Sequence, residues 1–127
     1  MTSQLLKRLE KTGQKAAMIF TASDYANIPI PGIVTYSACK SFTSFLGEGL
    51  YSELGDKIDI ISLKPGNVDT KLNPEGQEFL PINDFIKPPK VASYCLRDLG
   101  CEPTTYGYSL HEALANILKL IYPVIPK

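Results

Sequence analysis

Two short apolar segments separated by one long helical pattern constrain the fold more than any other feature of this sequence. Residues 16–20 and residues 58–63 are both rich in apolar side chains, and small and apolar residues recur at helical spacing over residues 35–54 between them. A strand, a helix and a strand in this order predict parallel strands joined by a right-handed crossover. The continuous apolar run at residues 16–20 predicts a strand that is buried on both faces.

Turn-forming residues divide the rest of the chain. Two prolines predict a loop at residues 27–32, and a segment rich in Pro, Gly and Asn predicts a long loop, with room for a short helix, over residues 67–89. We expect a helix at residues 90–99, a short third strand at residues 104–108 and a final helix at residues 110–121, ended by proline. The predicted fold class is α/β, with about three parallel strands and flanking helices in a partial, doubly wound sheet.

The length of 127 residues suffices for one core but is short for a dinucleotide-binding protein, which usually builds its site from two βαβ halves. Near the N-terminus, Leu5, Leu6 and Leu9 share one helical face that ends at Gly13, which is the pattern of the last turns of a longer helix. We therefore expect one unit, residues 1–127, that corresponds to part of a larger fold.

Charge and cysteine content exclude several classes of function. Thirteen basic residues balance thirteen acidic ones without long blocks of either sign, so no nucleic-acid footprint is expected. Cys39, Cys95 and Cys101 are odd in number and His111 is the only histidine, so we expect no metal site and reduced thiols that are buried or half-buried. These features suit a cytoplasmic chain.

Membrane insertion is not expected either. No apolar run reaches the roughly 18 residues of a membrane span, and no cleavable signal is recognisable at the N-terminus. The longest candidate, residues 113–125, is interrupted by polar residues and lacks the basic face of a helix that lies on a membrane surface. A helix that covers the sheet is the preferred interpretation of this segment.

A phenol and an ammonium group stand four positions apart on the long predicted helix. Tyr36 and Lys40 share one helical face, because side chains at i and i+4 are neighbours. A free phenol has a pKa of about 10 and is a poor base at neutral pH, but a cation beside it favours its ionised form. The pair is therefore suited to exchange a proton with a hydroxyl or carbonyl group. The spacing alone is also frequent in ordinary amphipathic helices.

Ser23 directly follows the first predicted strand, thirteen positions before Tyr36. Ligands of open parallel sheets bind beyond the carboxyl ends of the strands. We therefore expect the Ser23 hydroxyl to hold a substrate oxygen beside the tyrosine.

Taken together, three segments resemble the short-chain dehydrogenase/reductase family. In that family a serine ends the fifth strand, a Tyr-x-x-x-Lys motif opens the next helix, and a Pro-Gly turn after the sixth strand leads to a threonine near the nicotinamide. The matching segments here are residues 20–23 (Phe-Thr-Ala-Ser), residues 36–40 (Tyr-Ser-Ala-Cys-Lys) and residues 64–70 (Lys-Pro-Gly-Asn-Val-Asp-Thr). The resemblance implies a Rossmann-like sheet and a nicotinamide cofactor, NAD or NADP.

The resemblance also implies roles for individual residues. By position, Tyr36 would be the acid/base, Lys40 would activate it and bind the cofactor ribose, and Ser23 would bind the substrate oxygen. The residues against the nicotinamide end of the cofactor would be Pro65, Gly66, Val68 and Thr70.

The C-terminal third narrows the resemblance to one branch of the family. Residues 96–100, followed by Thr105, Gly107 and His111, are similar to the group of 17β-hydroxysteroid dehydrogenases and very-long-chain 3-oxoacyl-CoA reductases. This implies a lipid-like substrate and a location in the cytoplasm or on the cytosolic face of the endoplasmic reticulum. We expect His111 itself to be a structural hydrogen-bonding residue rather than a catalyst.

The sequence lacks three parts of the family pattern: the glycine-rich turn after the first strand, the residue that discriminates NAD from NADP, and an Asn-Ala-Gly segment. Gly13 and Gly32 are too isolated to build a phosphate-binding turn. We therefore expect weak NAD(P) binding or none from this chain alone, and an open apolar edge on the strand at residues 16–20.

Two functions remain open from the sequence. The first is an NAD(P)(H)-dependent oxidoreductase that reduces a ketone or oxidises a secondary alcohol of a lipid-like substrate, here in a truncated form. The second is an inactive dehydrogenase remnant that serves as an interaction or structural subunit. In both cases the helix at residues 35–54 is the expected surface for a homo-oligomer.

Overall fold

The computed structural model describes residues 4, 7–8, 11–12, 15–71 and 85–122. Within the first twelve residues, those that are described are helical. The predictions for Gly13, for the leucines at positions 5, 6 and 9, for the middle of the 67–89 loop and for Pro123 lie outside the described residues.

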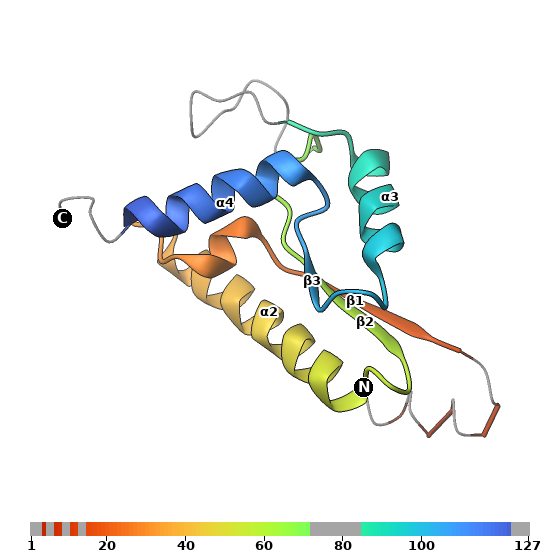
Figure 1. The fold of residues 1–127 in the computed structure, drawn as a ribbon. Coiled ribbons are helices and arrows are strands. Elements are labelled where there is room, and N and C mark those ends of the chain that lie inside the picture. Colours follow the sequence, from red (N-terminus) through yellow and green to blue (C-terminus); the bar gives the residue numbers. More distant parts are fainter. Residues whose placement is uncertain (1–3, 5–6, 9–10, 13–14, 72–84, 123–127) are drawn as a thin grey trace.

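The chain forms a three-stranded parallel sheet with strand order β1-β2-β3 and helices on both faces (Figure 1). The predicted α/β class is confirmed. In chain order the elements are β1 (Ala17–Thr21), the 3₁₀ helix η1 (Asp24–Asn27), α2 (Val34–Leu54), β2 (Asp59–Leu63), α3 (Pro88–Asp98), β3 (Thr104–Thr105) and α4 (Ser109–Ile121).

Successive residues of β2 face opposite layers of the fold, because side chains alternate along a strand. Ser62 lies 3.2 Å, oxygen to oxygen, from Ser44 of α2, whereas Leu63 packs in a cluster with Val91 and Cys95 of α3. Figure 1 accordingly shows α2 and α3 on opposite sides of the sheet. β2 is therefore the strand that is buried on both faces.

β1 does not have the burial that its apolar run predicts. Its residues alternate between exposed and half-buried, and Ile19 is 44% exposed. β1 lies at the edge of the described sheet and pairs with β2 alone, in a register from Ala17 opposite Asp59 to Thr21 opposite Leu63. One face of β1 is left uncovered by the described elements, which the residue types could not reveal. The expected open edge is present within the described part of the chain.

Proline and glycine set two boundaries that differ from the expected ones. α3 begins at Pro88, two residues earlier than predicted, because proline is favourable at the first helical positions, where no amide donor is needed. β3 is shorter than predicted, because Gly107 adopts a φ of +64° and its amide donates to the Thr105 hydroxyl. The chain turns there instead of continuing as a strand.

The three cysteines are free thiols, as expected, but their exposure differs from the prediction. Cys95 is buried against the sheet, and burial raises the pKa of its thiol. Cys39 and Cys101 are exposed rather than half-buried. Among the described residues no cluster of His, Cys, Asp and Glu is arranged to hold a metal ion. None of the described helices is both long enough and apolar enough to cross a membrane.

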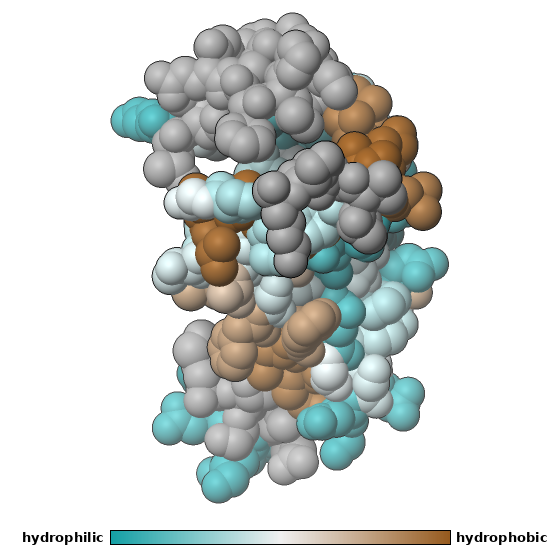
Figure 2. Space-filling model, turned by 90° about the vertical axis from the view of Figure 1, so that its left-hand side faces the viewer, coloured by the Kyte–Doolittle hydropathy of each residue, from teal (hydrophilic) through white to brown (hydrophobic). Residues whose placement is uncertain are grey.

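α4 packs against η1 rather than over the sheet as predicted. The Tyr122 hydroxyl, just after α4, donates to the Pro29 carbonyl at 2.6 Å, and Lys119 of α4 donates to the Tyr106 hydroxyl, which Asn27 of η1 also contacts. Large apolar side chains on α2 and α4 remain exposed. Figure 2 shows such side chains in separate patches on one face, with hydrophilic side chains between them.

Replacing the turn glycine after β3 tests the packing of α3 on the sheet. A Cβ at position 107 would lie 2.9 Å from Val91 Cγ1 in a backbone conformation that L-residues rarely adopt. We expect Gly107→Ala to lower the free energy of unfolding by about 2 kcal/mol in urea denaturation. Gly49→Ala is the control, since Gly49 lies within α2 with open space around it and alanine there should stabilise the chain by about 0.5–1 kcal/mol. Equal effects of the two changes would contradict this description of the packing.

Candidate active site

A cavity of about 440 Å³ opens at the carboxyl ends of β1 and β2. Ligands of open α/β sheets bind at this edge, because the helices leave the ends of the strands uncovered there. The residues that line it are Thr21, Ala22, Ser23, Tyr36, Lys40, Leu63, Pro65, Gly66, Val68, Thr70, Pro88, Val91 and Ala92.

The cavity brings together all seven site residues that the sequence predicts. The end of β1 supplies Ser23, the first two turns of α2 supply Tyr36 and Lys40, and the segment after β2 supplies the rest, Pro65, Gly66, Val68 and Thr70. The walls that come from α3 (Pro88, Val91 and Ala92) were not predicted from the sequence. The one sequence feature that points to these walls is the position of the predicted helix directly after the loop that follows β2.

Ser23 is 6% exposed and caps the short helix η1. Its Oγ accepts a hydrogen bond from the Tyr25 amide at 3.3 Å and donates to Asp24 Oδ1 at 2.9 Å. A serine hydroxyl has a single proton, so donation to a ligand requires that the proton turn away from Asp24, whereas acceptance leaves this bond in place. This cap was not predicted from the sequence, although Ser followed by Asp is a frequent helix-start signal.

Lys40 is held between the end of β1 and the ring of Tyr36. Its Nζ donates to the Thr21 carbonyl at 3.1 Å and lies 5.6 Å from the centroid of the Tyr36 ring. An ammonium over an aromatic face is attracted by the ring quadrupole. The contact therefore places a positive charge beside the phenol, which is itself 44% exposed.

The segment after β2 forms hydrogen bonds or a β-bridge with three other parts of the fold. The Pro65 carbonyl accepts from the Asp24 amide at 3.1 Å, and the Gly66 amide donates to His111 Nδ1 at 3.1 Å. Val68 forms an isolated parallel bridge with Ile86. His111 is 1% exposed and accepts this hydrogen bond, which agrees with the expectation that it is a hydrogen-bonding residue of the fold.

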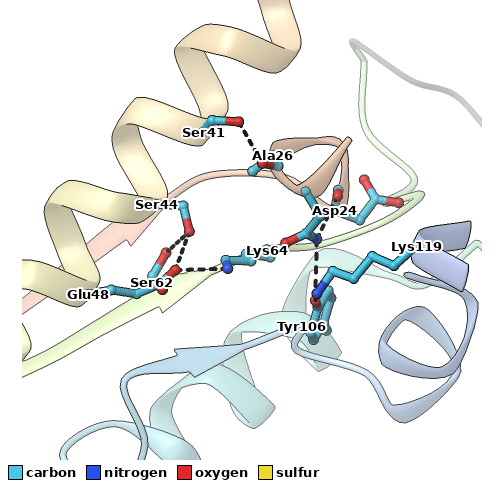
Figure 3. A network of polar contacts seen from close by, with 10 residues as sticks. Asp24, Ala26, Ser41, Ser44, Glu48, Ser62, Lys64, Tyr106 and Lys119 are labelled. Carbon is cyan, nitrogen blue, oxygen red and sulfur yellow. Dashed lines mark hydrogen bonds and ion pairs between the residues drawn. The ribbon is translucent and has the colours of Figure 1, made fainter. Parts of the chain in front are cut away.

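A buried polar network lies behind the cavity, between β2 and α2 (Figure 3). Lys64, just before the Pro-Gly turn, has a side chain that is 8% exposed, and its Nζ lies 2.8 Å from Glu48 Oε1. The Ser44 hydroxyl donates to the same oxygen at 2.6 Å and lies next to Ser62. Partial burial would raise the pKa of Glu48, but the hydrogen bonds from Lys64 and Ser44 outweigh it, so the pKa lies below its ordinary value.

The lining residues fit the nicotinamide end of a dinucleotide. Leu63, Val68 and Val91 provide an apolar wall that suits a flat ring, and Lys40 and Tyr36 provide polar groups that suit hydroxyl or carbonyl oxygens. The sequence contains no glycine-rich turn for the pyrophosphate. The described residues therefore match one end of such a cofactor.

Fold and cavity together define an α/β protein with a candidate ligand cavity at the carboxyl ends of its parallel strands. The sequence profile of the family described as "short chain dehydrogenase" matches residues 1–80. The chain therefore belongs to the short-chain dehydrogenase family.

Among its relatives are very-long-chain 3-oxoacyl-CoA reductases. The human protein is 28% identical over 105 residues, which cover 82% of this chain and 33% of the human one. Reductase-A of Danio rerio is 28% identical over 125 residues, which cover 98% of this chain and 38% of that one. The chain thus spans about a third of the length of these curated relatives.

Solved structures share the fold over about half of their length. A 7β-hydroxysteroid dehydrogenase superposes with a TM-score of 0.76 at 16% identity and covers 93% of this chain and 48% of its own. The 3-ketoacyl-(acyl-carrier-protein) reductase of Brucella melitensis, solved with NADH, superposes with a TM-score of 0.63 at 25% identity, covering 84% of this chain and 48% of its own.

Removal of the Glu48 charge should lower the free energy of unfolding more than removal of the Lys64 charge. Glu48→Gln leaves the buried Lys64 charge unpaired and should lower the free energy of unfolding at neutral pH by about 2 kcal/mol, after allowance for the water that reaches Glu48. Lys64→Met removes the buried charge and keeps the volume, so its cost should be at most about 1 kcal/mol.

The pH dependence of stability checks the same pair. Because the folded pKa of Glu48 is below its ordinary value of 4.5, its contribution is present above that value and is lost as the pH falls through the folded pKa. Urea denaturation below about pH 5 should therefore show a steeper loss for the wild type than for Glu48→Gln. Parallel pH profiles of the two proteins would contradict this.

Proposed function

We propose that the cavity is the catalytic site of an NAD(P)(H)-dependent oxidoreductase that interconverts a ketone and a secondary alcohol. The observation that carries the proposal is the convergence of Ser23, Tyr36 and Lys40 on one cavity, next to the segment after β2. Ser23 and the Tyr36–Lys40 pair come from two separate stretches of the chain, and the segment after β2 is a third. A helix with a Tyr-x-x-x-Lys spacing but no catalytic role would not require a serine from a neighbouring strand at the same cavity.

In the direction of reduction, the substrate oxygen lies between the Ser23 hydroxyl and the Tyr36 phenol. The Tyr36 phenol gives its proton to this oxygen, and the Lys40 ammonium stabilises the phenolate that remains. When bound, the nicotinamide supplies the hydride to the carbonyl carbon. Lys40, anchored on the Thr21 carbonyl, keeps its charge beside the phenol in both states of the tyrosine. Oxidation of the alcohol reverses each step.

The substrate class that we propose is lipid-like, a 3-oxoacyl thioester or a steroid. The apolar wall formed by Leu63, Val91 and Ala92 supports it, since an acyl chain or a ring system gains free energy when it leaves water. The names of the relatives, very-long-chain 3-oxoacyl-CoA reductases, support the same class. For this activity we place the protein in the cytoplasm or on the cytosolic face of the endoplasmic reticulum.

We expect the 127-residue chain alone to bind the cofactor weakly. The chain spans about a third of its relatives, and it offers polar groups for the nicotinamide end but no glycine-rich turn for the pyrophosphate. We therefore propose weak NADP or NAD binding by the 127-residue chain, and activity in the complete product of its gene.

A conservative change at the tyrosine tests the proposed chemistry. In the complete gene product, Tyr36→Phe should lower kcat for 3-oxoacyl-CoA reduction, followed by NADPH consumption, by about 100-fold or more, because the proton donor is lost. Tyr51→Phe is the matched control, since Tyr51 lies on the same helix but does not line the cavity. Full activity of Tyr36→Phe would refute the proposal. A wild-type protein that neither binds nor oxidises NADPH would favour the inactive remnant instead.

We also propose that α2 mediates a homo-oligomer. Phe42 and Phe45 are 70% and 69% exposed, and with Leu46 they lie at helical spacing on one face of α2. Exposed aromatic side chains in one stripe are typical of protein interfaces.

A charge placed in this stripe should abolish association. Phe45→Glu should shift the protein from dimer to monomer in sedimentation velocity, because burial of an unpaired carboxylate is costly. Leu120→Glu is the control, since Leu120 is 76% exposed on a different helix and should leave the dimer intact. A monomeric wild type, or a dimer that survives Phe45→Glu, would contradict the proposal.

A further inference from the structure

We infer that His111 is a positioning residue that holds the Pro65–Gly66 peptide group in the wall of the cavity. The inference deepens the proposed function, on which its effect on cofactor binding rests. His111 does not line the cavity, so it would act through the backbone of Gly66, which does.

Both polar atoms of this one peptide group are bonded to distant parts of the chain. Its carbonyl oxygen, on Pro65, accepts from the Asp24 amide at 3.1 Å, and its N–H, on Gly66, donates to His111 Nδ1 at 3.1 Å. The oxygen and the N–H of a trans peptide point in opposite directions, so the two bonds together fix the plane of the group. Rotation of the peptide would break both.

The imidazole also occupies the space that a side chain at position 66 would need. A Cβ on Gly66 would lie 2.9 Å from His111 Cδ2 and 3.0 Å from Cγ. The glycine therefore lets the ring approach the backbone, and the buried ring supports the turn from behind by contact as well as by its hydrogen bond. Tyr108 packs against the same ring edge to face, with centroids 5.2 Å apart.

α4, which carries His111, contacts η1, the short helix that follows Ser23. α4 packs on η1 through Lys119, Tyr106 and Asn27, and the Tyr122 hydroxyl donates to the Pro29 carbonyl. Asp24, which holds the other end of the peptide group, is the first residue of η1. The Pro65–Gly66 peptide group is thus held between the first residue of η1, next to Ser23, and α4.

A nuclear magnetic resonance experiment on the 127-residue chain tests the hydrogen bond directly. An N–H···N bond transmits a scalar coupling between its two nitrogens, so we expect a coupling between the Gly66 amide nitrogen and His111 Nδ1 in uniformly ¹⁵N-labelled protein. Its absence, with both resonances assigned, would overturn the inference. This measurement needs no variant and no turnover.

Two substitutions separate the hydrogen bond from the packing. His111→Asn offers a carboxamide oxygen near the place of Nδ1, whereas His111→Leu fills the space without an acceptor. We expect the Gly66 amide to exchange with solvent about tenfold faster in His111→Leu than in His111→Asn, as loss of one buried hydrogen bond predicts. The Ile61 amide of buried β2 reports global unfolding and is the internal reference. Equal Gly66 exchange in the two variants, relative to Ile61, would overturn the inference.

The complete gene product provides the functional readout. His111→Leu should raise the KM for NADPH about tenfold with a smaller effect on kcat, and His111→Asn should restore most of the affinity. Equal loss in both variants would show a merely structural role. If the wild type has no activity, the proposed function fails, whereas the coupling and exchange results still decide whether His111 positions the peptide.

Discussion

Parallel pairing of β1 with β2 is the constraint on which the candidate site depends. The register from Ala17 opposite Asp59 to Thr21 opposite Leu63 brings the carboxyl ends of both strands to one edge of the sheet. The pairing continues past the strands, since the Ala22 amide donates to the Leu63 carbonyl and the Asp24 amide to the Pro65 carbonyl. A shift of one residue would turn the β1 side chains to the other face and separate Ser23 from the Pro-Gly turn.

Behind this edge, polar contacts connect β2 and the segment after it to α2 and α4. The Lys64–Glu48 pair joins the end of β2 to α2. His111 of α4 accepts a hydrogen bond from the Pro65–Gly66 peptide group. Buried polar contacts of this kind add little net stability but penalise any arrangement that leaves one partner unsatisfied. They therefore favour one position of α2 and of the Pro65-Gly66 segment over others, which is what a candidate site with three converging side chains requires.

Several features were predictable from the sequence and others were not, for identifiable reasons. The α2 pattern and the end of the second strand before Pro65-Gly66 are local signals, and the structure has both where they were expected. The burial of β1 was predicted wrongly, because an apolar run shows which side chains prefer burial and not whether a neighbouring layer covers them. The sequence did not reveal that Ser23 caps η1 or that His111 accepts from the Gly66 amide. In both contacts the donor is a backbone amide whose position depends on the fold.

The sequence by itself determined the strand–helix–strand order, the family of the chain and seven of the residues that line the cavity, because these depend on residue type, spacing and local backbone preference. Tertiary structure alone decided that Lys40 rests on the Thr21 carbonyl, that Glu48 neutralises Lys64, and that α4 lies on η1 and reaches Gly66 through His111. These contacts join residues that are far apart in the sequence, up to 93 positions for Tyr122 and Pro29, so they form only when the packing of the layers brings the partners together.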